Sequence, residues 1–177
     1  AGEAAPLPRP GRATLRGMLV RGSERKDLRT PRAILRSGLI VFEDRLSRLA
    51  VADAAVKWTL DYTKERKAFG QSISQFQNSK FLLAELHSEV QMASAYVDRC
   101  LELHCEGKLT AEQAAAAKFL TTELQNKVVD RCLQLHGGYG YMNEYKIARA
   151  WADSRIQTIY GGTSEIMKEI VGRAIVK

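Results

Sequence analysis

The sequence predicts an all-α protein, an antiparallel up-and-down bundle of the four-helix type with a short extra helix at its C-terminal end. Three observations predict it. Beyond residue 40, apolar residues recur at helical spacing through long segments. The links between these segments are short and contain glycine, which favours antiparallel neighbours. No segment alternates apolar and polar residues for long enough to indicate a sheet.

Local signals place the ends of the helices. Gly70 and Gly107 are expected to end the first two helices, because glycine readily adopts the left-handed conformation that closes a helix. Thr110 followed by Gln113 is a capping-box pattern, which indicates the start of the third helix. The five expected helices cover about 42–68, 75–106, 110–135, 143–157 and 164–175.

Apolar residues at helical spacing define the expected core. The stripe comprises ten residues at helical spacing in the first two helices, namely Leu46, Leu49, Val56, Leu60, Phe81, Leu82, Leu86, Val90, Ala93 and Val97. The larger apolar side chains are expected to belong mostly to the same core, namely Trp58, Phe81, Met92, Tyr96, Phe119, Met142 and Met167.

The first 38 residues differ in composition from the rest. All four prolines lie within the first 31 residues, amid Arg and Gly and without a sustained period. We expect residues 1–38 to be irregular or disordered and residues 39–177 to form the helical domain. Residues 1–48 hold eleven basic and five acidic residues, which is most of the net charge of +7. Because the remainder is nearly neutral, we expect no nucleic-acid partner.

Composition also excludes two classes of function. No stretch approaches the roughly 18 consecutive apolar residues of a membrane span, so we expect none. The cysteines, Cys100, Cys105 and Cys132, lack the paired spacing of metal ligands. We expect them to be reduced core thiols and expect no metal site.

Three junctions at predicted helix ends contain glycine, at residues 66–70, 134–140 and 161–165. In the last, two glycines precede Thr163 or Ser164, either of which can cap a helix whose first N–H groups then point outward, toward an anion. Arg66, in the expected last turn of the first helix, either offsets the helix dipole or binds a phosphate. Gly137 and Gly138 either close a helix or let a ligand approach the backbone. The residues alone leave these alternatives open.

Four ordered motifs carry a resemblance to a known family. They are Tyr62 to Gly70 followed by Gln77, then Gln134 to Tyr141, then Glu144-Tyr145, and finally Ile159 to Ile166. From Asp61 to Lys177 the chain resembles the C-terminal helical domain of the acyl-CoA dehydrogenases. The version Tyr160-Gly161-Gly162-Thr163 looks most like the long-chain branch.

This resemblance implies α,β-dehydrogenation of a fatty acyl-CoA thioester in fatty-acid β-oxidation. FAD is the implied cofactor, and its flavin N5 accepts a hydride from the β-carbon while a carboxylate takes the α-proton. Electron-transfer flavoprotein is the implied acceptor. A homodimer or homotetramer is implied because one cofactor is shared across an interface. The bacterial cytoplasm and the mitochondrial matrix are both open as the location.

The resemblance also assigns site residues. Those matching Arg66, Phe69 and Gln77 reach the FAD of a neighbouring subunit. Those matching Gln134, Gly137 and Gly138 line its adenosine and pyrophosphate side. Those matching Thr163, Ser164 and Glu165 touch the flavin of their own subunit. Arg45, Gly161 and Gly162 are the expected substrate-side residues.

The catalytic base departs from the family pattern. Many members place a glutamate where this chain has Gly161, whereas the long-chain branch takes its base from the start of the first bundle helix. The matching position here is Ile40, which cannot take a proton. The nearest carboxylates are Asp44 and Glu43, displaced by about 6 Å along a helix. We expect one of these two residues to be the base.

The family also has an N-terminal helical domain and a middle β-domain before this bundle, and residues 1–44 resemble neither. We therefore expect a truncated chain that is inactive alone and binds FAD weakly or not at all. A second hypothesis is a catalytically inactive helical module that keeps only the oligomerisation surface of the family.

Overall fold

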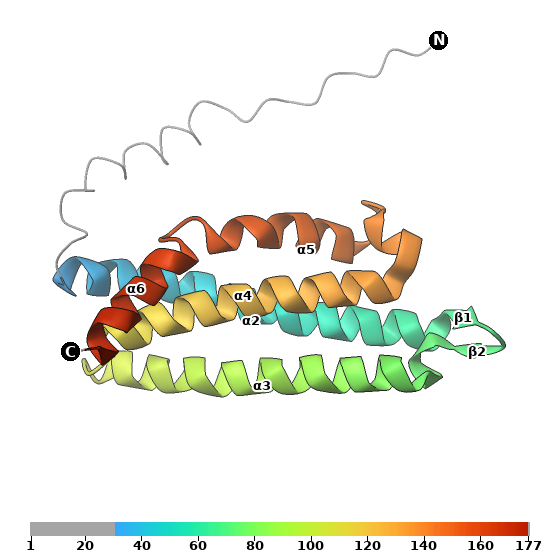
Figure 1. Cartoon of the computed structure of the whole chain (residues 1–177), viewed down its shortest axis with the longest axis horizontal. Coiled ribbons are helices and arrows are strands. Elements are labelled where there is room, and N and C mark those ends of the chain that lie inside the picture. The colour runs from blue at the N-terminus through green and yellow to red at the C-terminus, as the bar shows by residue number, and fades with distance from the viewer. Residues whose placement is uncertain (1–30, 177) are drawn as a thin grey trace, which may run out of the picture. The chain divides into compact units, whose positions relative to one another are not determined.

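The predicted all-α bundle is confirmed by the computed structural model, which describes the backbone of residues 31–176 and the side chains of residues 48–176. Within this part the helices are α2 (Pro31–Glu65), α3 (Gln77–Cys105), α4 (Ala111–His136), α5 (Lys146–Arg155) and α6 (Ser164–Ile175). From α2 to α5 successive helices reverse direction, and α6 lies at one end of α4 (Figure 1). The chain divides into two units, and the second, which begins at Gly38, contains the hydrophobic core and the helices α3 to α6.

The first helix begins earlier than Phe42, where the sequence analysis places its start. Helix α2 starts at Pro31. Proline suits the first position of a helix, because its missing N–H would have no partner there and its φ angle is already helical. Pro31 therefore begins a helix, although it was expected to lie in an irregular segment of residues 1–38. Residues 1–30 of that segment lie outside the described residues.

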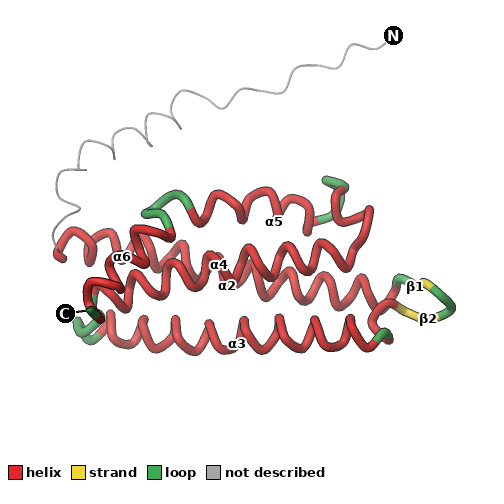
Figure 2. Tube along the Cα trace, in the orientation of Figure 1, coloured by secondary structure: helices red, strands yellow, loops and turns green. Residues whose placement is uncertain are grey.

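The same helix also ends earlier than expected, at Glu65, and a small hairpin follows it. Strands β1 (Lys67–Ala68) and β2 (Gln71–Ser72) pair antiparallel. The two turn residues between them, Phe69 and Gly70, have φ angles of 51° and 82°. A two-residue hairpin turn of type I′ requires positive φ at both positions. Figure 2 shows the hairpin at the junction of α2 and α3.

The core lies around α4. Val128, Val129 and Cys132 of α4 are fully buried against Ala52 and Ala55 of α2. Five residues of the expected apolar stripe are buried, namely Leu49, Val56, Leu86, Val90 and Val97, whereas Leu60 is exposed. The residues that α2 contributes at these positions are small, and the larger aliphatic side chains Leu86 and Val90 of α3 belong to the same buried cluster.

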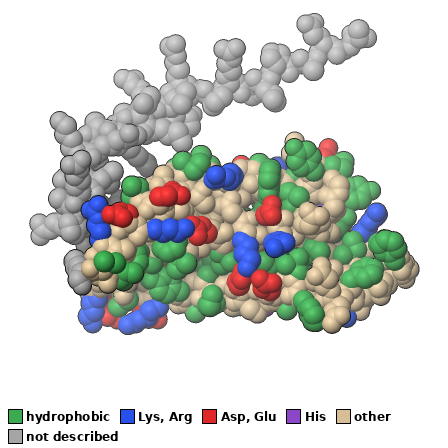
Figure 3. Space-filling model, in the orientation of Figure 1, with side chains coloured by type: hydrophobic (Ala, Val, Ile, Leu, Met, Phe, Trp, Pro, Cys, Tyr) green, Lys and Arg blue, Asp and Glu red, His purple; other side chains and the backbone are tan. Residues whose placement is uncertain are grey.

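The larger apolar side chains do not lie in this core, contrary to expectation. Met92, Phe81, Met142 and Tyr96 are exposed to 71%, 65%, 44% and 37%. The others, Trp58, Phe119 and Met167, are half-buried. Apolar side chains are visible across the face that Figure 3 draws. A surface of this kind is typical of a domain that packs against other protein in its assembly.

The three cysteines differ in their exposure. Cys100 and Cys132 are buried free thiols, as expected, but Cys105 near the end of α3 is exposed. Burial raises the pKa of the Cys132 thiol to about 11, against the opposing effect of a hydrogen bond with Thr59.

No helix among the described residues has the length and apolar character that crossing a membrane requires.

The predicted capping box at the start of α4 is confirmed. The Thr110 hydroxyl accepts from the Gln113 N–H at 3.3 Å, and the Gln113 side chain accepts from the Thr110 N–H at 3.0 Å. These two bonds satisfy donors that the first helical turn would otherwise leave without partners.

We predict that Thr110→Ala lowers the free energy of unfolding by about 1 kcal/mol, because the Gln113 N–H loses its acceptor. Chemical denaturation of the chain measures this. The Thr110→Ser variant keeps the hydroxyl and should stay within about 0.5 kcal/mol of the parent. Equal losses for the two variants would show that the cap contributes nothing.

Candidate functional site

The three glycine junctions lie at opposite ends of α4. The hairpin of residues 66–70 and the turn of residues 137–141 are found at its C-terminal end, whereas residues 161–165 are found at its N-terminal end (Figure 1). Lys118 of α4 contacts Gly162 at one end, and His136 closes α4 at the other. At 1.5 Å per residue these two positions are about 27 Å apart. The structure therefore brings two of the three junctions together and separates the third.

An aromatic cluster joins the first two junctions. The ring of Tyr62, near the end of α2, stacks on His136 with 4.3 Å between centroids, and the Tyr62 hydroxyl donates to the His136 carbonyl at 3.2 Å. Tyr145 meets both rings edge-on at 6.2 Å. Such contacts hold the end of α2 against the end of α4. Burial raises the pKa of Tyr62, although the charge of Arg66 acts in the opposite direction, so its hydroxyl serves as a neutral donor.

Arg66 is the first residue beyond α2 and not part of its last turn, which corrects the expectation. Its N–H still donates to the Tyr62 carbonyl at 2.9 Å. The guanidinium carbon lies 5.4 Å from the ring centroid of Tyr139, within the range of a cation–π contact. Arg66 is exposed. Its planar fork of donors is thus held beside the glycine turn and stays accessible to an anion.

Phe69 occupies the tip of the hairpin and is 96% exposed. Its φ of 51° is unusual for a residue with a side chain, and its ring meets that of Phe76 edge-on at 6.4 Å. Gln77, the next residue, is exposed at the start of α3. The backbone of Phe69 thus adopts an unfavourable conformation that holds an aromatic ring almost entirely in solvent, which makes the residue a candidate for binding another molecule.

Gly137 and Gly138 begin the turn that follows α4, and no side chain occupies the space beside their backbone. A Cβ added to either glycine would meet no heavy atom within 4 Å, so the backbone faces open space. Gln134, one turn earlier, is also exposed. Gly140 differs, because its Cβ would lie 2.5 Å from the Leu133 carbonyl oxygen. Gly140 is needed for packing, whereas Gly137 and Gly138 leave room for a group that lies against the backbone.

We call this set of residues the hairpin-end site: Arg66, Phe69, Gln77, Gln134, Gly137 and Gly138. An accessible guanidinium, open backbone at two glycines and an exposed ring fit a dinucleotide with a charged diphosphate and flat bases.

The residues 161–165 form the second candidate, which we call the α6-start site. Thr163 caps α6, since its hydroxyl accepts from the Ile166 N–H at 3.3 Å. Ser164 is buried, and its hydroxyl has no hydrogen-bond partner within the described chain. The pKa of Glu165 is lowered by a bond from its own N–H and then by one from the Thr163 hydroxyl. Its carboxylate therefore serves the start of the helix, where negative charge is favoured.

The predicted catalytic and substrate residues Glu43, Asp44 and Arg45 have side chains outside the described part of the chain. Their backbone belongs to α2. Gly161, with φ of 65°, and Gly162, with φ of 100°, connect Tyr160 to α6. Neither can take a proton, so these two residues can contribute only backbone groups to chemistry.

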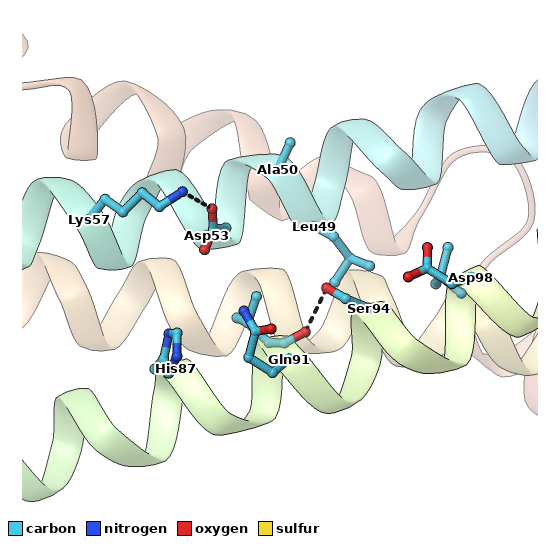
Figure 4. Close-up of a pocket in the computed structure, with 10 residues that line it drawn as sticks. Leu49, Ala50, Asp53, Lys57, His87, Gln91, Ser94 and Asp98 are labelled. Atoms are coloured by element: carbon cyan, nitrogen blue, oxygen red, sulfur yellow. Dashed lines mark hydrogen bonds and ion pairs between the residues drawn. The ribbon is translucent and has the colours of Figure 1, made fainter.

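A groove of about 410 Å³ lies elsewhere, between α2 and α3. Figure 4 shows Asp53 and Lys57 of α2 facing His87, Gln91 and Asp98 of α3 across it. Lys57 forms an ion pair with Asp53 at 2.5 Å, and the residues predicted for the site do not line the groove. No cluster of three metal-ligating side chains occurs in the described region. We therefore place the candidate function at the ends of α4.

Two buried cations near the α6-start site, Lys118 and Arg48, were not predicted, and they are 1% and 2% exposed. Both contact the segment that precedes α6. The available signal was the single lysine within the otherwise small and apolar run from Ala114 to Leu120, at a position that faces the core.

The fold and the two sites define a helical-bundle domain that presents glycine-containing, anion-compatible turns at both ends of its central helix. The family model for the acyl-CoA dehydrogenase C-terminal domain matches residues 45–176, and the chain belongs to this family. The family is one of oxidoreductases.

Individual proteins similar to this chain agree with this family membership. The chain is 48% identical to the mitochondrial long-chain specific acyl-CoA dehydrogenase of Sus scrofa, over 73% of this chain and 32% of that protein. It is 35% identical to a subunit of the caffeyl-CoA reductase-Etf complex of Acetobacterium woodii, over 73% and 34%. The crystal structure of an acyl-CoA dehydrogenase from Geobacillus kaustophilus superposes with a TM-score of 0.75 and 38% identity, over 80% and 37%. The chain thus spans about a third of the length of these relatives.

Protonation of His136 provides a test of the aromatic cluster. Its Nδ1–H donates to the Cys132 carbonyl at 2.9 Å, and burial lowers its pKa below the usual 6.5, although the bond to Cys132 acts in the opposite direction. Below pH 6.5 the unfolded chain therefore binds more protons than the folded chain. We predict that the free energy of unfolding falls with decreasing pH in this range, by at most about 1.4 kcal/mol per pH unit from this residue.

The His136→Phe variant keeps a ring against Tyr62 but cannot titrate. It should be less stable at neutral pH by about 1 kcal/mol, because the Cys132 carbonyl loses a donor. Its stability should depend less on pH below 6.5. Denaturation at a series of pH values measures both effects, and an equally steep loss in the variant would contradict the prediction.

Proposed function

We propose that this chain is the part of an FAD-dependent acyl-CoA dehydrogenase that contributes to two different flavin sites in a homodimer or homotetramer. The observation that carries the proposal is the distance of about 27 Å between the two sites along α4. The hairpin-end site suits the diphosphate and adenosine portion of FAD in a neighbouring subunit. The α6-start site suits the flavin and thioester of the chain's own subunit.

Each site would act through its own groups. At the hairpin-end site, the Arg66 guanidinium offsets the charge of the diphosphate, and Gly137 and Gly138 allow it close to the backbone. Phe69 at the tip of the hairpin and Gln77 at the start of α3 would face the neighbouring subunit. At the α6-start site, Thr163 to Glu165 orient the helix start, and N–H groups of Gly161 and Gly162 suit a thioester oxygen. FAD, when bound, supplies the hydride-accepting chemistry that no side chain provides.

The base of this reaction would be Asp44 or Glu43. Both belong to α2, and the α-proton of a thioester must come within hydrogen-bond reach of one of them. Arg45 would contribute to the substrate side. Turnover that persisted in a reconstituted enzyme carrying both Glu43→Gln and Asp44→Asn would overturn this assignment.

The exposed apolar surface supports assembly with other protein. Met92, Phe81 and Tyr96 on α3 are exposed in the single chain, and Phe69 protrudes at the hairpin. We propose that copies of the chain and the remainder of the enzyme cover such side chains. We further propose a fatty acyl-CoA substrate, electron-transfer flavoprotein as acceptor, and the mitochondrial matrix or the bacterial cytoplasm as location. The similarity to a mitochondrial long-chain specific acyl-CoA dehydrogenase and to a subunit of a caffeyl-CoA reductase-Etf complex supports this proposal.

A pair of glycine variants tests the cofactor role. A chimera in which residues 45–176 replace the corresponding domain of the Geobacillus kaustophilus dehydrogenase should bind FAD, measured by flavin absorbance per protein. We predict that Gly138→Ala leaves the unfolding free energy of the isolated chain within about 1 kcal/mol, since its Cβ meets open space. In the chimera the same methyl group should lower FAD content, because it occupies the approach to the backbone.

The control is Gly140→Ala, whose Cβ would collide with a backbone carbonyl oxygen at 2.5 Å. It should destabilise the isolated chain by about 2 kcal/mol or more, with or without cofactor. An unchanged FAD content for the Gly138→Ala chimera would contradict a cofactor at this turn. A chimera that assembles but binds no FAD would instead favour the hypothesis of an inactive oligomerisation module.

A further inference from the structure

The residues of the segment between α5 and α6 do not by themselves fix its backbone conformation. It contains the 3-10 turn Ile156–Thr158 and then Gly161 and Gly162, with φ angles of 65° and 100°. Glycine populates positive and negative φ about equally, so two successive glycines leave many conformations accessible. Thr163 fixes only the helix side of this turn, through its bond from the Ile166 N–H. Another contact must fix the side that precedes the helix.

Lys118 provides that contact. Its side chain is 1% exposed, and its ammonium donates to the Gln157 carbonyl at 3.1 Å and to the Gly162 carbonyl at 2.5 Å. The first carbonyl lies four residues before the glycine pair, and the second belongs to the pair itself, so the two bonds span the segment from Gln157 to Gly162. A buried charge is costly unless hydrogen bonds compensate it, and bonds from a charged donor are stronger than neutral ones. The ammonium therefore holds the two ends of the turn at a defined separation.

A second buried cation acts on the same segment. Arg48 of α2 donates from Nε to the Gln157 side-chain oxygen at 2.9 Å, and the Tyr160 hydroxyl donates to the same oxygen. The Arg48 guanidinium carbon also lies 5.8 Å from the Tyr160 ring centroid. The residue before the glycine pair is thus tied to α2, while the glycine pair itself is tied to α4.

A purely structural role for Lys118 is the alternative. A buried side chain that only filled space would be served as well by methionine, which has a similar shape and carries no charge. The ammonium instead reaches backbone carbonyls in the one connection that carries the glycine pair. Lys118 has almost no exposed surface, so it cannot act on a ligand directly.

We infer that Lys118 is a positioning residue, which selects the conformation of the Gly161–Gly162 turn and so the direction of the N–H groups at the start of α6. This inference rests on the proposed function only in one respect, the identity of the groups that bind at this turn, a thioester and a flavin. The positioning itself concerns the chain without a ligand.

The parent chain tests the contact directly. In a nitrogen-15 spectrum of lysine ammonium groups near neutral pH, exposed amines exchange with water too quickly to be seen. Lys118 should give a persistent signal with nuclear Overhauser contacts to the Hα protons of Gly162. The absence of such a signal, or contacts to other residues alone, would overturn the inference without any substitution.

Variants test the consequence. In Lys118→Met, amide hydrogen exchange should accelerate by about tenfold or more at Ile159, Tyr160 and Ile166, whose N–H groups are hydrogen-bonded beside the turn. The amide signals of Gly161 and Gly162 should also shift. Amides of α3 at Leu86 and Val90 should keep their rates. The Lys118→Arg variant retains a charged donor and should restore much of the protection.

The matched control is Asn126→Ala. Asn126 also lies on α4 and donates from Nδ2 to a backbone carbonyl of the adjacent segment, that of Ser154, at 3.0 Å. This variant should affect the end of α5 and not the glycine turn. Uniform acceleration in Lys118→Met, or equal effects of Lys118→Met and Asn126→Ala at Ile166, would reduce Lys118 to a general stabilising residue and overturn the inference.

These outcomes are separable from those of the proposed function. The exchange and ammonium measurements need no cofactor, so their failure overturns the role of Lys118 and leaves the cofactor proposal standing. A chimera that binds no FAD would overturn the cofactor proposal and leave the positioning role of Lys118 standing.

Discussion

The packing of α4 inside the bundle is the constraint on which the rest of the structure depends. Its buried face, with Val128, Val129 and Cys132, contacts α2, and α3, α5 and α6 also pack against α4. Because a helix rises by a constant 1.5 Å per residue, the length of α4 sets how far apart its two ends lie. The hairpin-end site and the α6-start site are therefore held at a defined distance by one rigid element.

Side-chain contacts at each end of α4 join the neighbouring turns to this helix. At the C-terminal end the stacked pair Tyr62 and His136 joins α2 to α4, which places Arg66 beside the glycine turn. At the N-terminal end the Lys118 ammonium bonds two carbonyls of the segment before α6. At the N-terminal end a glycine pair provides freedom, and a side chain from a packed helix removes it. This combination gives a close backbone approach together with one conformation.

Local sequence signals predict much of the fold. The capping box at Thr110 and the apolar spacing of Leu86, Val90 and Val97 depend on neighbours along one helix, and each is confirmed. The hairpin at Phe69 was not predicted, because two-residue strands show no alternation. The exposure of Met92 was not predicted either. Its side chain is apolar whichever surface covers it, so composition cannot distinguish a core from an interface.

Part of the candidate site could likewise be predicted from the sequence and part could not. Its glycines and Arg66 form motifs in the sequence, whereas Lys118 acts on carbonyls 39 and 44 residues away, and the sequence does not indicate that contact. The central claim is that the two sites of one chain serve two different flavins. It is tested most directly by mixing two chimeric dehydrogenases, one with Arg66→Ala at the hairpin-end site and one with Gly162→Val at the α6-start site. In a mixed dimer one flavin site would receive both intact halves, so FAD content should rise above that of either variant alone, toward one FAD per dimer. No gain on mixing, with mixed dimers shown to form, would contradict the claim.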